Sequence, residues 1–223
     1  MQRQECDPLL QDCPDGERCT PYGYVGNTWH AFRCVPLASD PKEVGETCSV
    51  FGAPNAGCDD CVAGAMCLFV YEDDGEGVCV GFCEPPSDQP SCSEPGKICA
   101  VANDGVLLLC LDPCNPLVPG CLPEAGCLYI HDIQDFACAP RWMDAAYGEP
   151  CSSFLGACAT GLACVDREAF PEGECASACC TAACDLSAPN QCPHAADGQI
   201  CTPLYEPGQA PPGNENVGLC KMP

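Results

Sequence analysis

The stretch CDPLLQDCPDGERC at residues 6–19 recurs as CNPLVPGCLPEAGC at residues 114–127, with each of its three cysteines displaced by 108 positions. The similarity extends further along the chain, because Gly45-Glu46-Thr47-Cys48 and Gly148-Glu149-Pro150-Cys151 follow these stretches at similar distances. Closely repeated cysteine spacing is typical of a covalent framework that fixes the ends of loops. The sequence therefore predicts an internal duplication.

Each half of the duplication divides into modules of four cysteines, which gives a tandem array of six modules. The modules of the first half (1–111) and of the second half (112–223) begin at Cys6, Cys48, Cys83, Cys114, Cys151 and either Cys179 or Cys184. Small repeated modules commonly stack so that each one contacts mainly the next. We therefore expect a linear array in which contacts between distant modules are few.

Within a module, a short apolar or β-branched stretch follows the third cysteine, and a polar turn then leads back to the fourth. Asn103-Asp104-Gly105 is such a turn, and its residues tolerate left-handed backbone conformations. A glycine also stands three residues before the third cysteine in five of the six modules, as Gly16 does before Cys19. These patterns predict a small disulfide-rich fold, mostly irregular, with short antiparallel β-hairpins and almost no helix.

The composition is that of a protein stabilised by cross-links. Leu, Ile, Val and Phe make up about 18% of the chain and the formal net charge is −24, which together are typical of disordered proteins. The 27 cysteines reverse that conclusion, because such a content indicates a disulfide scaffold from an oxidising compartment. We expect a protein that is secreted or exposed at the cell surface, and that unfolds when it is reduced.

The charge and hydropathy exclude two classes of partner. Eight basic residues stand against 32 acidic ones and are scattered singly, so we expect no binding to nucleic acid or to an anionic membrane surface. The longest apolar run, residues 106–111, is too short to span a bilayer. The excess of acidic residues is explained by a need for solubility. The alternative explanation is that these residues attract a cation or a basic partner.

The middle module of the second half carries a recognisable pattern. Gly148-Glu149-Pro150-Cys151, then Cys158 to Cys164 through Ala-Thr-Gly-Leu-Ala, then Gly173-Glu174-Cys175, resembles extracellular modules of the growth-factor-binding and Dickkopf type. The acidic, lysine-poor texture of the whole chain resembles uncharacterised secreted or lipid-anchored cysteine-rich proteins of myxobacteria. These resemblances imply an extracytoplasmic location and transfer no functional residues.

Three cysteines lie outside the predicted framework of 24, namely Cys58 and two of Cys179, Cys180 and Cys184. An odd total leaves at least one thiol without an intramolecular partner. Cys58 is the candidate, because Cys58-Asp59-Asp60-Cys61 has no counterpart in the second half. An unpaired thiol also offers a route to self-association, and the remaining pair is free to bridge itself.

Two other roles are open for these cysteines. A redox dithiol at Cys58 and Cys61 is disfavoured, because two aspartates separate the cysteines and no positive residue is near them in the sequence. Soft-metal ligation remains an alternative, because thiolates bind such metals well. The candidate ligands are Cys58, Cys61, Cys179, Cys180 and Cys184. We expect the three histidines, His30, His131 and His194, to be surface residues rather than ligands.

The acidic run Glu72-Asp73-Asp74-Gly75-Glu76 provides the candidate calcium ligands. Carboxylate oxygens are the ligands that Ca²⁺ prefers, but the spacing is not that of an EF-hand loop. The same residues also suit a solvated hairpin turn. Calcium binding therefore stays an alternative to a purely structural role for Glu72, Asp73, Asp74 and Glu76.

The chain contains no recognisable catalytic motif and no phosphate-binding glycine loop, so we expect a non-enzymatic protein without a cofactor. The sequence favours a binding, adhesive or structural protein with an unknown protein or glycan partner. The candidate contact residues are Tyr22, Tyr24, Trp29 and Phe32, together with Tyr205 in the proline-rich segment that runs to Val217. The same aromatics could instead pack over disulfides. A protease inhibitor that presents one loop is the alternative function.

Overall fold

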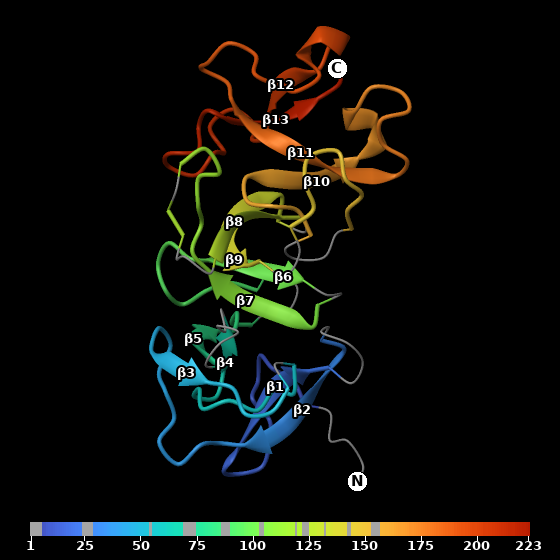
Figure 1. Ribbon diagram of the computed structural model, residues 1–223. Helices are drawn as coiled ribbons and strands as arrows, with labels where there is room; N and C mark the ends of the chain where they lie inside the picture. The colour runs from blue at the N-terminus through green and yellow to red at the C-terminus, as the bar shows by residue number, and fades with distance from the viewer. Residues whose placement is uncertain are drawn as a thin grey trace. The chain divides into compact units, whose positions relative to one another are not determined.

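The chain forms a set of short antiparallel hairpins (Figure 1), and 13 disulfides hold them together. The computed structural model describes residues 6–23, 29–53, 55–68, 75–85, 90–102, 105–118, 120–121, 125–131, 133–141, 144–152 and 157–223. All 27 cysteines lie in these ranges. No helix in the described ranges is long and apolar enough to cross a membrane.

Contacts divide the chain into two compact units, Met1–Asp112 (unit 1) and Pro113–Pro223 (unit 2). Unit 1 contains two separate hairpins, β1–β2 and β6–β7, and a three-stranded sheet in the order β3-β5-β4. Its strands are β1 (Glu17–Tyr22), β2 (Ala31–Pro36), β3 (Thr47–Ser49), β4 (Ala65–Leu68), β5 (Glu76–Gly81), β6 (Ile98–Ala102) and β7 (Leu107–Leu111).

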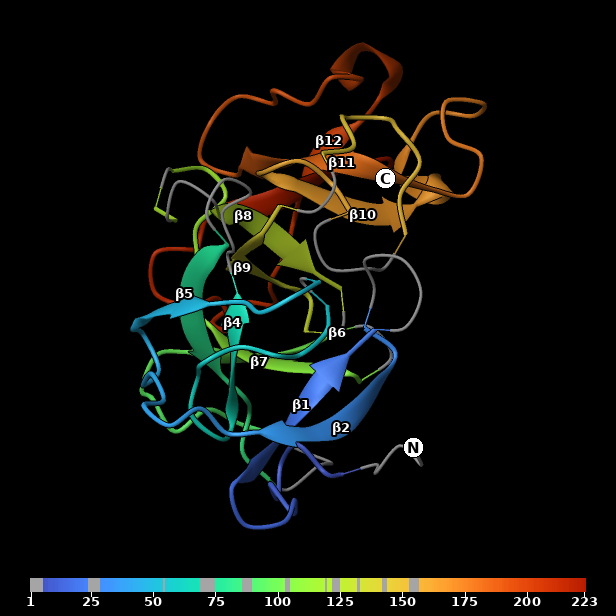
Figure 2. The ribbon, with the colours of Figure 1, turned by 60° about the horizontal axis from the view of Figure 1, so that its bottom comes forward.

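Unit 2 has a different sheet arrangement. It contains one hairpin, β8–β9, and a four-stranded sheet in the order β10-β11-β13-β12, in which Figure 2 shows β10 and β11 side by side. Its elements are β8 (Ala125–Ile130), β9 (Asp135–Pro140), β10 (Leu162–Asp166), the 3₁₀ turn η1 (Arg167–Ala169), β11 (Ala178–Asp185), the 3₁₀ turn η2 (Ala195–Asp197), β12 (Ile200–Pro203) and β13 (Val217–Lys221).

Every group of four framework cysteines is paired in the same way, first to third and second to fourth. The bridges are Cys6–Cys19 with Cys13–Cys34, Cys48–Cys67 with Cys61–Cys79, Cys83–Cys99 with Cys92–Cys110, Cys114–Cys127 with Cys121–Cys138, Cys151–Cys164 with Cys158–Cys180, and Cys184–Cys201 with Cys192–Cys220. We number these groups module 1 to module 6 in chain order.

In each module the third and fourth cysteines lie directly opposite each other on neighbouring antiparallel strands, as Cys19 does opposite Cys34. The two bridges therefore attach the loop that precedes the hairpin at adjacent points of the ladder. A bridge that closes a loop of this length contributes roughly 2–4 kcal/mol by restricting the unfolded chain. This contribution supports strand pairs that would be marginal by themselves in water.

The glycine before the third cysteine makes the turn that the sequence predicts. All five such glycines have a left-handed backbone, with φ of 82°, 81°, 88°, 77° and 99° at Gly16, Gly64, Gly96, Gly161 and Gly198. Module 4 differs, because its glycine stands directly beside the third cysteine. A Cβ on Gly126 would lie 2.5 Å from Thr160 Oγ1, so this residue permits close packing between modules 4 and 5.

The repeated Gly-Glu pair closes the middle module of each unit. In unit 1 the amide of Gly45 donates to the carbonyl of Cys79 at 2.8 Å, and the Cys79 amide donates back to Glu46 at 3.0 Å. In unit 2 Gly148, Glu149 and Cys180 make the same two bonds at the same distances. These bonds fix the position of the fourth cysteine in modules 2 and 5.

The predicted boundary of the fifth module is partly wrong. The fourth cysteine of module 5 is Cys180 and module 6 begins at Cys184, so neither lies outside the framework. The additional pair is Cys175–Cys179, which bridges itself across four residues. Strand β11 carries Cys179, Cys180 and Cys184, and it joins modules 5 and 6 into one sheet.

The expectation that each module contacts mainly its sequence neighbours is also wrong in unit 2. One buried cluster there combines Phe136 of module 4, Ala163 of module 5, and Val217 and Leu219 of module 6. A smaller cluster in module 2 consists mostly of cysteines, together with Ala65. Disulfide sulfur thus occupies much of the interior, and modules 4 and 6 pack against each other although module 5 separates them in the sequence.

Candidate binding site

A cleft of about 290 Å³ opens beside the proline-rich loop that connects β12 to β13 in unit 2. Its floor and walls come from that loop, from both flanking strands and from Leu186, which follows β11. The lining residues are Leu186, Pro203, Tyr205, Glu206, Pro207, Gly208, Ala210, Glu215 and Val217. The predicted contact segment Tyr205–Val217 therefore surrounds a hollow instead of forming a flat surface.

Two tight turns give the loop its shape. The amide of Gln209 donates to the carbonyl of Glu206 at 2.9 Å, and the amide of Asn214 donates to the carbonyl of Pro211 at 2.9 Å. Gly208 and Gly213 adopt φ values of 78° and 92°, which glycine reaches without steric cost. The sequence Pro-Gly at the first turn and Pro-Pro-Gly-Asn at the second thus encodes the local conformation.

Asn214 anchors the loop to module 4. The residue is 4% exposed, and its Nδ2 donates to the carbonyl of Cys114 at 3.2 Å and to the hydroxyl of Tyr205 at 3.4 Å. The side chain of Asn115 donates in the other direction, to the carbonyl of Gly213 at 2.7 Å. These contacts hold the second turn in place without any ligand.

Tyr205 anchors the first part of the loop. Its hydroxyl donates to Asp135 Oδ1 at 2.5 Å, and its ring packs against the shared cluster of unit 2. Burial raises the pKa of Tyr205, and the hydrogen bond to the Asp135 carboxylate raises it further. Tyr205, predicted as a partner contact, is therefore half-buried, with its polar end occupied and its side chain forming part of the cleft wall.

The cleft carries negative charge at its edge. Glu215 Oε2 accepts a hydrogen bond from the amide of Gly213 at 2.9 Å. Hydrogen bonds from its own amide and from that of Gly213 lower the pKa of this carboxyl group, so it stays ionised in mildly acidic solution. Glu206 supplies a second carboxylate, and none of the described residues that line the cleft is basic.

Unit 1 contains a second hollow, of about 240 Å³, where modules 1, 2 and 3 meet. Leu9, Val44 and Phe82 contribute apolar surface, and Glu84 and Glu94 contribute carboxylates. Here one carboxylate already has a cation nearby, because Lys97 Nζ lies 3.7 Å from Glu94 Oε2 and 3.2 Å from Asp112 Oδ1. This hollow is therefore a weaker candidate for binding a positive group.

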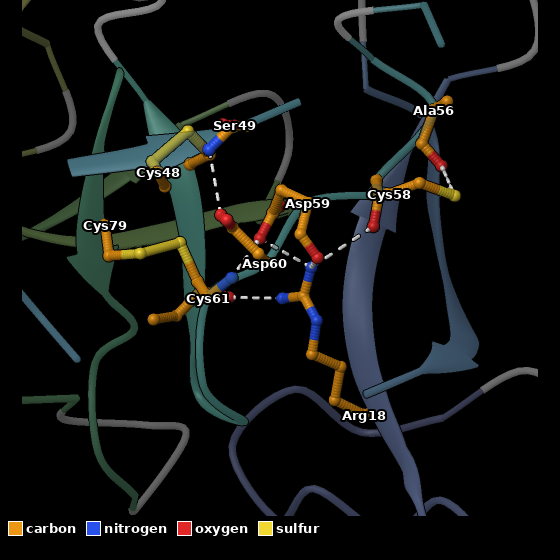
Figure 3. A network of polar contacts seen from close by, with 12 residues as sticks. Arg18, Cys48, Ser49, Ala56, Cys58, Asp59, Asp60, Cys61 and Cys79 are labelled. Atoms are coloured by element: carbon orange, nitrogen blue, oxygen red, sulfur yellow. Dashed lines mark hydrogen bonds and ion pairs between the residues drawn. A yellow bond between two sulfur atoms is a disulfide. The ribbon is translucent and has the colours of Figure 1, made fainter. Parts of the chain in front are cut away.

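Cys58 is the cysteine that forms no disulfide, and it is partly exposed in unit 1 (Figure 3). Its sulfur lies 3.7 Å from the carbonyl oxygen of Ala56. Arg33 Nη2 donates to the same sulfur at 3.6 Å and also to the Ala56 carbonyl. No positive residue is near this thiol in the sequence, but in the fold β2 brings Arg33 to it from 25 residues away.

The two aspartates beside Cys58 point away from it into separate contacts. Arg18, which is 0% exposed, places Nη2 2.7 Å from Asp59 Oδ1 and donates from Nη1 to the carbonyl of Ala65 at 2.6 Å (Figure 3). Asp60 Oδ1 accepts from the amide of Ser49 at 2.8 Å. The segment Cys58-Asp59-Asp60-Cys61, which has no counterpart in the second half, therefore connects module 1 to module 2.

The redox-dithiol and soft-metal alternatives conflict with the disulfide pattern. Cys61 is bonded to Cys79, so no Cys58–Cys61 dithiol exists. Of the other proposed ligands, Cys179, Cys180 and Cys184 are all in disulfides. Sulfur atoms do approach within 4.8 Å of one another in several modules, but these triads belong to the paired bridges of the framework. Their sulfur is not available as thiolate.

The remaining predicted site residues are only partly described. Of the calcium candidates, Glu72, Asp73 and Asp74 lie outside the described residues, and Glu76 begins β5 with an exposed side chain. Tyr24 also lies outside the described residues.

The predicted aromatic contact loop is less exposed than expected. Tyr22 is only 4% exposed, and the guanidinium carbon of Arg33 lies 4.9 Å from the centre of its ring. Tyr22 is therefore a packing residue that offers little surface to a partner, which agrees with the alternative that these aromatics pack in the interior. Trp29 and Phe32 are half-buried.

The sequence did not reveal the residues that hold these sites together. Arg18, Asn214 and Asp135 act through partners that are 41, 100 and 70 residues away. One signal was present at Arg18, because the duplication aligns it with Gly126, and such a difference indicates distinct packing beside the third cysteine. The comparisons with known proteins add no relative, because no protein-family model, no curated protein and no solved structure matches this chain.

Proposed function

We propose that this chain is an extracellular, non-enzymatic binding protein whose disulfide-linked modules present preformed loops to a partner. The 13 disulfides are typical of proteins that work outside the reducing cytosol. A cross-linked scaffold loses little conformational entropy when it binds, which favours recognition by loops. The cleft beside the loop at residues 204–217 is the proposed contact site.

The observation that carries this proposal is that the loop is fixed around a hollow by its own contacts. Buried Asn214 and the Tyr205–Asp135 hydrogen bond tie both parts of the loop to module 4. Known small-molecule sites usually exceed roughly 300 Å³. A cleft of about 290 Å³ lies at the lower limit of that range, and it has room for one side chain of a larger partner.

The geometry of this loop weighs against a protease-inhibitor role for residues 204–217. An inhibitor that binds by adding a strand must offer an extended segment to the enzyme. Residues 206–209 and 211–214 form turns closed by hydrogen bonds, which leaves no extended stretch between them. A hollow that receives a side chain is the feature that this loop presents.

A positional-scanning library tests the proposal. Acetylated and amidated hexapeptide pools, each with one amino acid fixed at the third position, are titrated against the oxidised protein by fluorescence polarisation. We expect some pools to bind measurably, and Ala210→Trp to weaken that binding at least tenfold by filling the cleft. Gln209→Trp is the matched control, because this exposed neighbour does not line the cleft. Absence of binding by every pool, or equal binding by Ala210→Trp, would overturn the proposal.

A further inference from the structure

We infer that the cleft of unit 2 receives a lysine or arginine side chain of a partner polypeptide. This inference rests on the proposed function and names the chemistry that the same site recognises. The cleft combines an apolar floor, one aromatic wall and two carboxylates at its edge. A long aliphatic stem that ends in a positive charge matches all three features, whereas a purely apolar or an acidic side chain matches only some of them or none.

The floor suits the stem of such a side chain. Val217 is 1% exposed and lies at the start of β13, and Leu186 follows the end of β11. Leu186, Pro203 and Ala210, which are half-buried or exposed, offer aliphatic surface without a polar atom in the side chain, and the buried Val217 adds little to it. Lysine and arginine commonly lay their methylene groups along apolar surface of this kind and keep the charged end near water.

The wall suits the charge. Tyr205 lines the cleft and is half-buried; because its hydroxyl is bonded to Asp135, the side-chain surface that it leaves to a ligand belongs to the ring. Aromatic rings attract ammonium and guanidinium groups through the negative face of the π-system. The bond to Asp135 also limits rotation of the ring, which keeps this surface in place before binding.

The edge suits the charge as well. Glu206 and Glu215 both line the cleft, and the Gly213 amide holds Glu215 Oε2 at 2.9 Å. No described lining residue is basic, so no internal cation competes for these carboxylates. The hollow in unit 1 that Val44 and Phe82 line differs in this respect, because Lys97 already lies beside Glu94. The chain as a whole carries a net charge of −24, which also favours encounter with a basic partner.

The experiment compares matched pools of the same hexapeptide library. Lysine is compared with norleucine, which keeps the stem and lacks the charge, and arginine is compared with citrulline, which keeps the shape and lacks the charge. We expect the charged pool of each pair to bind about tenfold more tightly, with a preference that falls as salt is added. Pools with glutamate should bind most weakly.

A pair of variants locates the effect. The double variant Glu206→Gln, Glu215→Gln should bring lysine and norleucine pools to within about twofold of each other. The control is Glu84→Gln, Glu94→Gln, which removes the same charge from the hollow of unit 1 and should leave the preference intact. Disulfide mapping of both variants checks that they fold.

The possible outcomes separate this inference from the proposed function. If neutral pools bind as well as basic ones and Ala210→Trp still blocks them, the cleft is a binding site but the assignment of a basic side chain is wrong. If basic pools are preferred equally by the Glu206→Gln, Glu215→Gln variant, the attraction arises elsewhere and the inference is again wrong. If no pool binds, the proposed function fails as well.

Discussion

Arg18 is the largest side chain in the described part of the chain that has no exposed surface, and its charge is matched by one carboxylate, Asp59. Burying two charges costs several kcal/mol, which their attraction and their other hydrogen bonds only partly offset. The pair is therefore weak evidence for high stability. Its value lies in fixing how modules 1 and 2 meet, because an incorrect register would leave a buried charge without a partner.

This arrangement predicts a non-additive response to mutation. Arg18→Met should lower the free energy of unfolding of the oxidised protein by about 3–5 kcal/mol, because Asp59 would remain buried without its cation. Arg18→Met combined with Asp59→Asn should recover much of that loss. Urea titration followed by tryptophan fluorescence measures both. A loss below about 1 kcal/mol for the single variant would show that the pair is not buried in solution.

Cys58 provides a second prediction at the same scale. Because the other cysteines are all in disulfides, alkylation of the denatured, unreduced protein should add one group per chain, and none to Cys58→Ser. Intact-mass spectrometry measures this directly. Two or more added groups would show that the disulfide pattern is incomplete, and no addition to the wild type would show that Cys58 is already bonded to another molecule.

The individual residues of the candidate site were only partly predictable. The proline-rich segment was identified because its composition indicates turns and because Tyr205 is an aromatic side chain within it. The sequence could not show that the Tyr205 hydroxyl bonds to Asp135, because the interaction joins modules 4 and 6 across 70 residues. The contact between Arg33 and Cys58 was unpredictable for the same reason, because 25 residues separate them in the chain.

Among the structural elements, the turn before the third cysteine gives the clearest test. Gly198 has φ of 99°, and an added Cβ would meet only Met222 Cε at 3.7 Å, an ordinary contact. Gly198→Ala should therefore lower the free energy of unfolding by about 1–2 kcal/mol through backbone strain alone. Gly120→Ala is the control, because this glycine of the same unit lacks a positive φ and has open space around it. Equal effects of the two variants would contradict the explanation.

The hairpins were predictable because two local signals coincide, a glycine that permits a left-handed turn and a β-prone stretch after the third cysteine. The boundary between modules 5 and 6 was not predictable. Four cysteines lie close together there, namely Cys175, Cys179, Cys180 and Cys184, and the chain can be divided into groups of four in several ways. The distance between successive modules indicates the correct division. Cys79–Cys83 and Cys110–Cys114 both leave three residues between successive modules, and Cys180–Cys184 does the same.

At the scale of the whole molecule, the disulfides join residues that are close in the sequence, whereas packing also joins residues that are far apart. All framework bridges are local, and the longest, Cys192–Cys220, spans 28 residues. Packing extends further within unit 2, where the shared cluster brings modules 4 and 6 together. Cysteine spacing could therefore predict the modules, while the closure of three modules into one compact unit depends on Phe136, Val217 and Leu219, whose partners are not marked by any spacing.

The two units should consequently fold as separate fragments. No disulfide joins residues 1–112 to residues 113–223 among the 27 cysteines, all of which are described, and each unit has its own dense network of internal contacts. Oxidative refolding of each fragment, with Cys58→Ser in the first to prevent disulfide exchange, should give six bridges in fragment 1–112 and seven in fragment 113–223.

Peptide mapping of the oxidised fragments by mass spectrometry identifies these pairings, and the full-length chain refolded in parallel is the control. Native pairing is expected because each bridge closes a short loop inside one unit, so that loop-closure entropy favours local partners over distant ones. If either fragment yields a mixture of isomers while the full chain pairs correctly, the units do not fold independently and contacts from the other unit must guide their oxidation.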